Sequence, residues 1–259
     1  MTAFENPFKQ GLADRRRQAG LWLTTGAAGV TEIAAGAGFA WLLLDMEHSP
    51  NDLIEVVDHL RAAVGGTAEP VVRVPWNEPV VVKRLLDQGA RSLMFPFVQS
   101  AEEARRAVAA TRYPPQGIRG FAGTSRATGY GLRPDYAARA AEEICVVVQV
   151  ETPEAIRAAG EIAAVPGIDG VFIGPNDLAA NMGHLGRPDA PPVRALIAEA
   201  LAAIGAAGKA AGLLNFSESG ARADFEAGFS FVAVSGDAFI LARETQRIAR
   251  TVFGDAAGR

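Results

Sequence analysis

The 259-residue sequence predicts an α/β protein with a (β/α)8 TIM-barrel fold. Eight short apolar segments run without polar interruption and alternate with segments of helical periodicity. Continuous apolar strands are typical of a parallel sheet that is covered on both faces. The chain length fits eight such repeats, and an apolar fraction of 49% supplies a substantial core.

A doubly wound open sheet is the alternative fold. Such a sheet is expected to carry a glycine-rich phosphate-binding turn after its first strand. The segment T-G-A-A-G at 25–29 contains glycine but lacks the G-x-G-x-x-G pattern. No segment resembles a linker, so we expect residues 1–259 to form a single barrel domain.

The expected strands are short apolar runs, several of them rich in β-branched residues. They cover residues 21–25, 41–47, 70–74, 92–98, 145–151, 170–174, 212–216 and 231–235. An amphipathic segment at 7–18 precedes them. Its Phe8 and Leu12 predict a short N-terminal helix that closes the bottom of the barrel.

Capping residues delimit the helices between the strands. Asn51 or Asp52 caps one helix, Ser100 forms a capping box with Glu103, and Pro153 lies in the first turn of another. Helices are expected over 30–37, 53–63, 79–88, 101–112, 135–143, from 153 onward, and over 177–182, 192–207, 217–228 and 239–253. The irregular stretch 113–134 is long for a loop in a compact domain, which suggests a function.

Composition narrows the class of protein. The net charge of −4 without a basic block argues against a nucleic-acid partner. The single cysteine, Cys145, permits no internal disulfide and indicates a reducing compartment. The N-terminal residues lack the apolar region of a secretory signal, and no apolar run is long enough to span a bilayer. We therefore expect a cytoplasmic protein without a membrane partner.

Polar residues follow the expected strands at their carboxyl ends, where a barrel places its active site. They are Asp45, Glu47 and His48 at the end of the second strand, Arg73 at the end of the third, Gln149 and Glu151 at the end of the fifth, and Asp177 after the sixth. A charge at the end of a buried strand is costly unless it is paired. Convergence of these separate segments predicts one functional site.

Glu151 and Asp177 are the candidate metal ligands. Two carboxylates that leave other positions to water and substrate suit Mg²⁺, Mn²⁺ or Co²⁺. A closed zinc site has no supporting cysteine or histidine cluster. The alternative for Glu151 is a structural ion pair.

His48 is the candidate general base, because a histidine oriented by a carboxylate titrates near neutral pH. Its alternative is a capping residue in the turn. Arg73 presents donors suited to a substrate carboxylate or a developing oxyanion, and its alternative is an ion pair with Asp45 or Glu47. None of the three lysines ends a strand, so a Schiff-base mechanism has no obvious nucleophile.

Six segments together resemble the HpcH/HpaI aldolase family. They are G-L-W-L, L-L-L-D-M-E-H-S-P-N-D, V-V-R-V-P-W-N, R-Y-P-P-Q-G-I-R-G, V-V-Q-V-E-T-P-E-A and G-V-F-I-G-P-N-D-L, and they occur in the family's order over nearly the whole chain. The resemblance implies a class II, metal-dependent pyruvate aldolase on a (β/α)8 barrel. Such an enzyme reversibly cleaves a 4-hydroxy-2-oxo acid, such as 4-hydroxy-2-oxoheptanedioate or a 2-keto-3-deoxy sugar acid, to pyruvate and an aldehyde.

The resemblance also assigns roles to single residues. Glu151 and Asp177 would hold the metal, with Gln149 near the bound pyruvate and the backbone of Asn176 and Asp177 on its carboxylate. Arg73 would stabilise the enolate that forms from pyruvate on the metal. His48 would act as the base through a metal-bound water, with Asp87 raising its basicity and Asp45 helping to orient it. The resemblance further implies a homo-hexamer, a trimer of dimers that exchange the last helix.

The sequence departs from the family pattern in three places. Met46 stands where a small residue is usual, and Asn176 replaces a residue that is commonly alanine. The loop at 113–134 also differs. We expect it to meet the acceptor aldehyde, with Arg119 and Arg126 either contacting substrate or remaining solvated. A CoA-ester lyase of the citrate-lyase-like superfamily and a non-catalytic binding barrel are the alternative functions.

Overall fold

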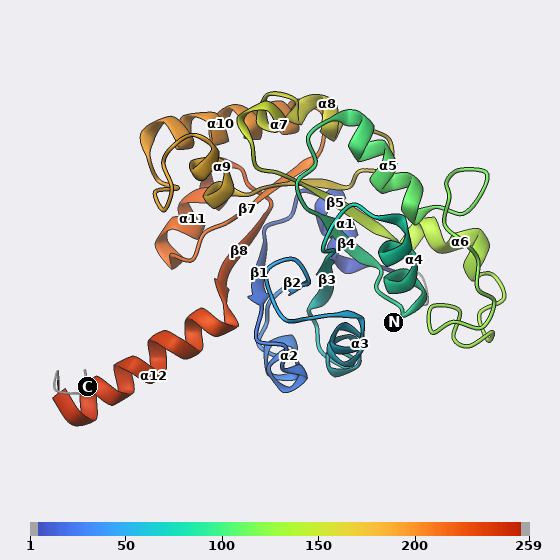
Figure 1. Ribbon diagram of the computed structural model, residues 1–259, viewed down its shortest axis with the longest axis horizontal. Coiled ribbons are helices and arrows are strands. Elements are labelled where there is room, and N and C mark those ends of the chain that lie inside the picture. Colours follow the sequence, from blue (N-terminus) through green and yellow to red (C-terminus); the bar gives the residue numbers. More distant parts are fainter. Residues whose placement is uncertain (1–4, 255–259) are drawn as a thin grey trace.

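The computed structural model describes residues 5–254 and contains a closed barrel of eight parallel strands (Figure 1). The strands lie around the barrel in sequence order, and β8 pairs with β1 to close it. They are β1 (Gln18–Leu23), β2 (Trp41–Asp45), β3 (Glu69–Arg73), β4 (Ser92–Phe95), β5 (Cys145–Val150), β6 (Gly170–Ile173), β7 (Ala210–Leu214) and β8 (Phe231–Gly236). The predicted (β/α)8 barrel is confirmed.

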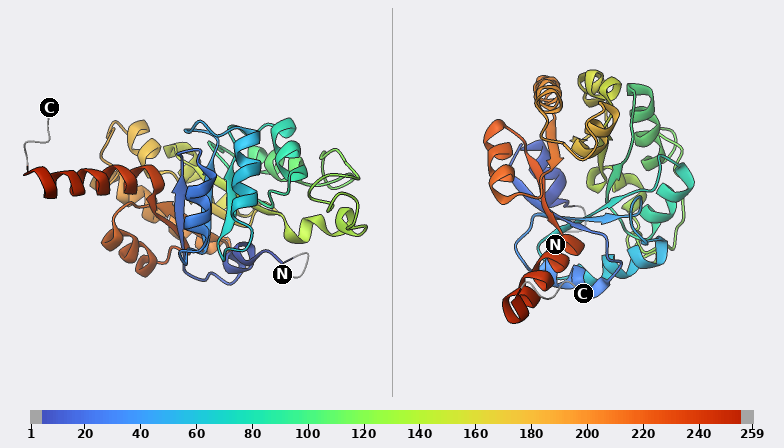
Figure 2. Two further views of the ribbon diagram at one scale, coloured as in Figure 1. Left: turned by 90° about the horizontal axis from the view of Figure 1, so that it is seen from below. Right: turned by 60° about the vertical axis from the view of Figure 1, so that its left-hand side comes forward.

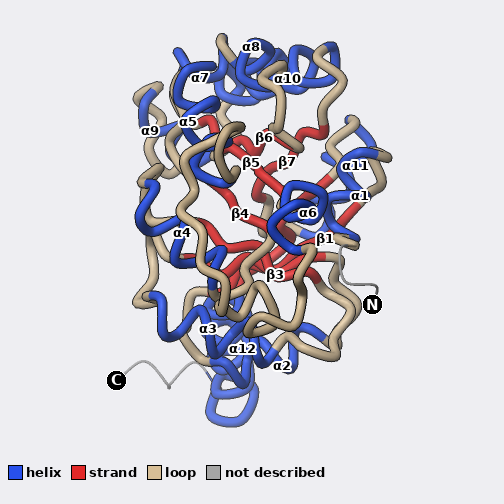
Figure 3. The backbone as a smooth tube through the Cα atoms, turned by 90° about the vertical axis from the view of Figure 1, so that its right-hand side faces the viewer, coloured by secondary structure: helices blue, strands red, loops and turns tan. Residues whose placement is uncertain are grey.

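Helices surround the strands (Figure 3). They are α1 (Pro7–Ala13), α2 (Ala28–Ala35), α3 (Leu53–Ala62), α4 (Pro79–Asp87), α5 (Ala101–Thr111), α6 (Tyr136–Glu143), α7 (Pro153–Arg157), α8 (Ala159–Ala163), α9 (Pro175–Asn181), α10 (Pro191–Ala206), α11 (Glu218–Ala227) and α12 (Asp237–Phe253). The predicted caps at Asp52 and Ser100 form, but the capping box at Ser100 is incomplete, because the Glu103 carboxylate accepts the backbone N–H of Gln99. Asp52 makes a capping box with Glu55, and the Ser100 hydroxyl accepts the backbone N–H of Glu103.

Several strands begin or end at different residues from those predicted. β2 ends at Asp45 rather than at residue 47, and β7 begins two residues before the expected 212. In β2 the cause is the Asp45 carboxylate, which accepts the backbone N–H of Glu47 at 3.0 Å and turns the chain out of the strand. Apolar character marks the interior of a strand, whereas a local side-chain bond of this kind sets its end.

The barrel interior is filled by aromatic and apolar side chains. Trp41, Phe172 and Phe231 pack together there, and Gly20 leaves room for the Trp41 indole, which lies 2.1 Å from the site of an added Cβ. Phe8 of α1 is fully buried against Trp41 and Phe231, with ring centroids 5.6 and 5.7 Å away. The predicted closing helix is confirmed, but it ends at Ala13, because β1 already begins at Gln18.

The irregular stretch between α5 and α6 lies at the amino ends of the strands. In a (β/α)8 barrel each helix runs antiparallel to its strands, so a loop that follows a helix returns to the bottom of the barrel. Arg126 of this loop shares a cavity with Pro7 of α1, with Glu69, the first residue of β3, and with Arg91, which precedes β4. The loop is therefore distant from the carboxyl-end face within one chain.

Helix α12 projects away from the barrel (Figures 1 and 2). Within the described residues it packs against β1 and β8 only near its root, and beyond that point its side chains are largely exposed. No helix within residues 5–254 is both long and apolar enough to cross a membrane. The sequence-based exclusion of a secretory signal concerns residues 1–9, of which 1–4 lie outside the described part.

Candidate active site

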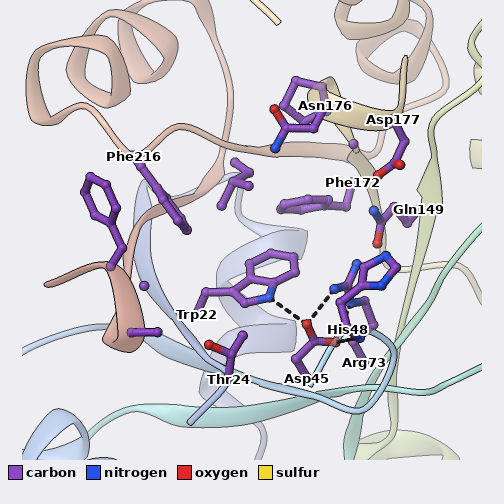
Figure 4. A pocket seen from close by; sticks show the side chains of 16 residues that line it. Trp22, Thr24, Asp45, His48, Arg73, Gln149, Phe172, Asn176, Asp177 and Phe216 are labelled. Atoms are coloured by element: carbon purple, nitrogen blue, oxygen red, sulfur yellow. Dashed lines mark hydrogen bonds and ion pairs between the residues drawn. The ribbon is translucent and has the colours of Figure 1, made fainter. Parts of the chain in front are cut away.

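A cavity of about 320 Å³ opens at the carboxyl ends of the strands (Figure 4). Its polar side is formed by Asp45, His48, Arg73, Gln149 and Asp177, which come from four separate strand ends and the turns after them. Its other side is apolar and is formed by Trp22, Phe172, Leu214, Phe216 and Phe239. The predicted convergence of polar residues at one face of the barrel is thus present.

Arg73, the last residue of β3, is held in a buried network of ion pairs. Its Nε and Nη2 donate to the two carboxylate oxygens of Asp45 at 2.8 and 2.6 Å. The Trp22 indole N–H donates to the same carboxylate at 3.1 Å, and the guanidinium lies 4.8 Å from the centre of the indole ring. Burial alone would raise the pKa of Asp45, but the bonds from Arg73 outweigh it, so this pKa is lowered and the carboxylate stays charged.

Glu47 is a second carboxylate beside the Arg73 guanidinium. Its Oε2 lies 2.7 Å from Nη1 of Arg73, yet no donor in residues 5–254 is aligned to hydrogen-bond with that buried oxygen. Burial raises the pKa of Glu47, against the attraction of Arg73. The arginine therefore lies between two carboxylates, so its charge is largely balanced and its position is fixed. The ion pair proposed as the alternative role for Arg73 is present, and it leaves the guanidinium at the cavity wall.

Glu151 follows β5 directly and is buried. One of its oxygens accepts the backbone N–H of Phe97 at 3.0 Å, and the other accepts the Gln149 amide at 2.6 Å. Burial, followed by the nearby charges of Asp177 and Glu47, raises the pKa of Glu151 to about 7. The negative charges of Asp177 and Glu47 thus act on a buried carboxylate, which is an arrangement that a cation would stabilise.

The donor set and its surroundings fit a magnesium-like cation. The Oε1 of Gln149 is buried without a hydrogen-bond partner among the described residues. A Cβ at Gly174 would lie 2.5 Å from Oε2 of Glu151, so this glycine keeps the space beside the carboxylate open. Residues 5–254 contain no group of three or more His, Cys, Asp or Glu side chains that could hold a metal. A cation there would rely on two carboxylates with water and substrate, as Mg²⁺ commonly does.

His48 lies at the cavity edge in the turn after β2. Its side chain is 67% exposed, and its Nε2 lies 4.0 Å from Oε2 of Glu47. The Asp45 carboxylate contacts the backbone N–H of His48 at 3.4 Å rather than its ring. Asp45 therefore positions the turn that carries His48, instead of orienting the imidazole as the sequence had suggested.

Asp87, at the end of α4, does not line the cavity. Its carboxylate accepts Arg119 Nη2 at 2.9 Å, and the fully buried Arg119 also lies over the rings of Tyr113 and Tyr136. Arg126 donates to the carbonyl of Gln88 at 2.8 Å. These residues lie at the opposite end of the barrel, so within one chain the loop at 113–134 does not meet the substrate as expected.

Trp22 and Phe172 of the apolar wall, and a buried polar network, were not predicted as parts of the site. Trp22 and Phe172 were assigned only to strands, although strand alternation places one face of β1 and β6 toward the barrel interior. His59 has no predicted role in the site, and it is 1% exposed between two polar partners. The signal in the sequence was a histidine at an apolar position of the expected helix 53–63, which indicates a buried polar group.

The geometry agrees with comparisons to known proteins. A family model described as HpcH/HpaI aldolase/citrate lyase matches residues 18–243. The chain is 49% identical over 258 residues to a hydroxypyruvate/pyruvate aldolase of Agrobacterium fabrum, with 99% of this chain and 97% of that protein covered. It is 48% identical over 246 residues to a 4-hydroxy-2-oxo-heptane-1,7-dioate aldolase of Shigella sonnei, with 95% and 94% covered.

A solved structure extends the comparison to three dimensions. An HpcH/HpaI aldolase/citrate lyase family protein from Burkholderia cenocepacia superposes with a TM-score of 0.93 at 44% identity, covering 96% of this chain and 99% of that one. The likeness includes all eight strands and the strand ends that carry the polar cavity wall. The chain is therefore a member of the HpcH/HpaI aldolase/citrate lyase family, and it is an aldolase, a carbon–carbon lyase.

Proposed function

We propose that this aldolase reversibly cleaves 4-hydroxy-2-oxo acids to pyruvate and an aldehyde with the help of a divalent metal ion. The observation that carries the proposal is the cavity wall itself. Glu151 is buried beside Gln149 of the cavity wall, and its charge interacts with that of Asp177, which lines the cavity together with the fixed guanidinium of Arg73. With a cation held by the two acids, this wall would present positive charge from the cation and from Arg73 to the oxygens of a 2-oxo acid.

Glu151 and Asp177 would hold the metal ion, which we expect to be Mg²⁺, Mn²⁺ or Co²⁺. Bound there, it would supply positive charge to the keto and carboxylate oxygens of the donor. Gln149 lies beside Glu151 and presents its amide to the same region. The first N–H groups of α9, at Asn176 and Asp177, have no partner within the helix and suit the donor carboxylate.

The cleavage step follows from residue chemistry. A base removes the proton of the C4 hydroxyl, the C3–C4 bond breaks, and the aldehyde leaves. The electron pair of the broken bond enters the pyruvate enolate, which regains a proton at C3. We assign the proton transfers to His48, and we assign to Arg73 the stabilisation of the enolate oxygen. Asp45 keeps the guanidinium in place, and Asp87 remains a candidate only if another subunit brings it to the cavity.

The apolar wall would accommodate the aldehyde part of the substrate. Phe216 and Phe239 pack against each other at 5.5 Å beside this wall, and neither Arg119 nor Arg126 lines it. The relatives named above act on hydroxypyruvate or pyruvate and on 4-hydroxy-2-oxo-heptane-1,7-dioate, as their names state. We therefore take 4-hydroxy-2-oxo acids, including 2-keto-3-deoxy sugar acids, as the substrate class.

We also propose that the chain forms a homo-hexamer, a trimer of dimers in which α12 is exchanged between subunits. Three exposed apolar residues of α12, Leu241, Ile248 and Val252, share one helix face because they are seven and four residues apart. Such a face on a projecting helix is stable only when it is covered. A cytoplasmic location fits the single buried cysteine.

A pyruvate-release screen tests the proposal. 4-Hydroxy-2-oxo acids with carboxylated, hydroxylated and apolar tails are offered with Mg²⁺, Mn²⁺ or Co²⁺, and pyruvate is followed with a coupled dehydrogenase. We expect release from at least one class. His48→Ala should lower kcat about 10²- to 10⁴-fold. His184→Ala should leave kcat unchanged, because His184 does not line the cavity.

Two results would contradict this function. Cleavage of a malyl-CoA-type ester without any pyruvate release would identify a CoA-ester lyase. Binding of 2-oxo acids and metal without turnover of any substrate would identify a non-catalytic binding barrel.

A further inference from the structure

A chain of buried hydrogen bonds connects helices α2 and α3 to the end of β2. Thr31 Oγ1 lies 2.6 Å from Nδ1 of His59, and Nε2 of His59 lies 3.0 Å from Oδ1 of Asn51. The Asn51 amide nitrogen donates to the backbone carbonyl of Asp45 at 2.8 Å. Thr31, His59 and Asn51 are each at most 5% exposed, so water does not compete for these bonds.

The direction of every bond in this chain is determined. The Asp45 carbonyl can only accept, so the Asn51 amide must present its NH₂ group there and its oxygen to His59. Nε2 of His59 must then carry a proton. Burial lowers the pKa of His59 and favours the neutral ring, so Nδ1 is left as an acceptor for the Thr31 hydroxyl. The result is a single neutral tautomer that donates toward Asn51.

The network ends at the turn that carries Glu47 and His48. Asn51 and the hydroxyl of Ser49 both bind the Asp45 carbonyl from one side. On the other side, the Asp45 carboxylate accepts the backbone N–H groups of Glu47 and His48. Asp45 therefore holds the turn from 46 to 50 at its start through the carboxylate and at its end through the backbone carbonyl. His59 holds Asn51, which binds that carbonyl.

We propose that His59 is a positioning residue of the active site. It holds Asn51 against the end of β2 and thereby fixes the turn that places His48 and Glu47 at the cavity. His59 touches neither the cavity nor the proposed metal ligands. It acts on turnover through the position of the base, so this inference rests on the proposed role of His48.

Two substitutions at His59 distinguish a role in positioning Asn51 from a role in filling space in the core. In His59→Gln, the amide nitrogen occupies the place of Nε2 and can still donate to Asn51. In His59→Asn, the shorter amide reaches only the place of Nδ1 beside Thr31, and the donor to Asn51 is lost. We expect His59→Gln to keep kcat within about threefold, whereas His59→Asn lowers kcat about 10- to 100-fold, the scale of an error of about 1 Å in position.

The Michaelis constant provides the first discriminating readout. Metal and donor bind to Glu151, Asp177 and Gln149, which the network does not touch, so KM should change little in His59→Asn. Thr31→Val removes the hydroxyl that donates to Nδ1 of His59 and should lower kcat less than His59→Asn does. Thr111→Val is its matched control, because Thr111 is a buried helical threonine whose hydroxyl binds only within α5 and to a neighbouring arginine.

Hydrogen exchange provides a readout that does not depend on turnover. The amides of Glu47 and His48 should exchange faster in His59→Asn than in the wild type, and at the wild-type rate in His59→Gln. Equal loss of kcat in both variants, with unchanged exchange at 46–51, would overturn the proposal. If the wild-type enzyme releases no pyruvate but exchange still rises only in His59→Asn, the positioning holds and the proposed function fails instead.

Discussion

Arg73 is the central residue of the site, and its position reflects the cost of desolvation set against its attraction to the Asp45 carboxylate. Removing an arginine and a carboxylate from water costs several kcal/mol for each ion, and the paired geometry with Asp45 compensates for this. The same geometry directs the guanidinium at the cavity instead of at solvent. The ion pair and the proposed catalytic role, which are alternatives when only the sequence is considered, are therefore compatible in this residue.

Gly174 allows a prediction at the scale of a single methyl group. In Gly174→Ala the added Cβ would lie 2.5 Å from Glu151 Oε2 and 2.9 Å from Gln149 Nε2, so both side chains must move. We expect metal affinity to fall about 10- to 100-fold, as it does when the support of a metal ligand is disturbed. Isothermal titration with Mn²⁺ measures it.

Gly205→Ala is the matched control, because no atom lies within 4 Å of its added Cβ. Its Mn²⁺ affinity should equal that of the wild type. An unchanged affinity in Gly174→Ala would exclude Glu151 as a ligand held in its present position.

Asp237 acts at the scale of elements, because it connects β8, β1 and the root of α12. Its carboxylate accepts the backbone N–H of Thr24 at 2.9 Å and the hydroxyl of Thr25 at 2.6 Å, and it also caps the N–H of Ala238. Burial would raise its pKa, but these bonds outweigh burial and lower it below the ordinary value of 3.8. The charged form is thus favoured in the folded protein.

The sign of the resulting pH dependence follows directly. A lowered pKa in the folded state contributes stability above the unfolded pKa of about 3.8, and this contribution is lost as the pH falls through the lower folded value. Asp237→Asn should cost about 1–3 kcal/mol of unfolding free energy at pH 7 and much less below pH 3. Urea unfolding at both pH values measures it.

Asp58→Asn, on the exposed face of α3, is the control, and it should change stability little at either pH. An equal loss in Asp237→Asn at pH 7 and at pH 3 would show that shape, rather than charge, holds this junction.

The sequence predicted elements better than contacts. Apolar runs and caps located every strand and the capped helices, because burial and capping are local properties of the chain. The role of Asp45, by contrast, depends on where Arg73 and Asn51 lie in space, 28 and 6 residues away. The loop at 113–134 was assigned to the substrate from its length, although its place after a helix already assigns it to the bottom of the barrel.

At the scale of the whole molecule, α12 would connect the proposed assembly to the site. Its first residues, Ala238 and Phe239, line the cavity, while its outer part projects from the barrel. The double variant Ile248→Glu with Val252→Glu places two charges on the apolar face of α12. We expect it to reduce the mass of the assembly, as measured by light scattering coupled to size-exclusion chromatography.

Arg250→Glu is the control on the same helix. Arg250 lies two residues from both Ile248 and Val252 and therefore points to the opposite face. This variant should keep the assembly of the wild type. Retention of the wild-type mass by the double variant would exclude this face as the contact between subunits.

Metal dependence is the most direct test of the central claim. The purified enzyme is treated with EDTA, dialysed, and assayed for pyruvate release from a 4-hydroxy-2-oxo acid before and after addition of Mg²⁺, Mn²⁺ or Co²⁺. We predict that release is lost on chelation and returns with the metal in the wild type, whereas Glu151→Gln regains little at the same metal concentration. Full release by the metal-free enzyme would contradict the proposed function.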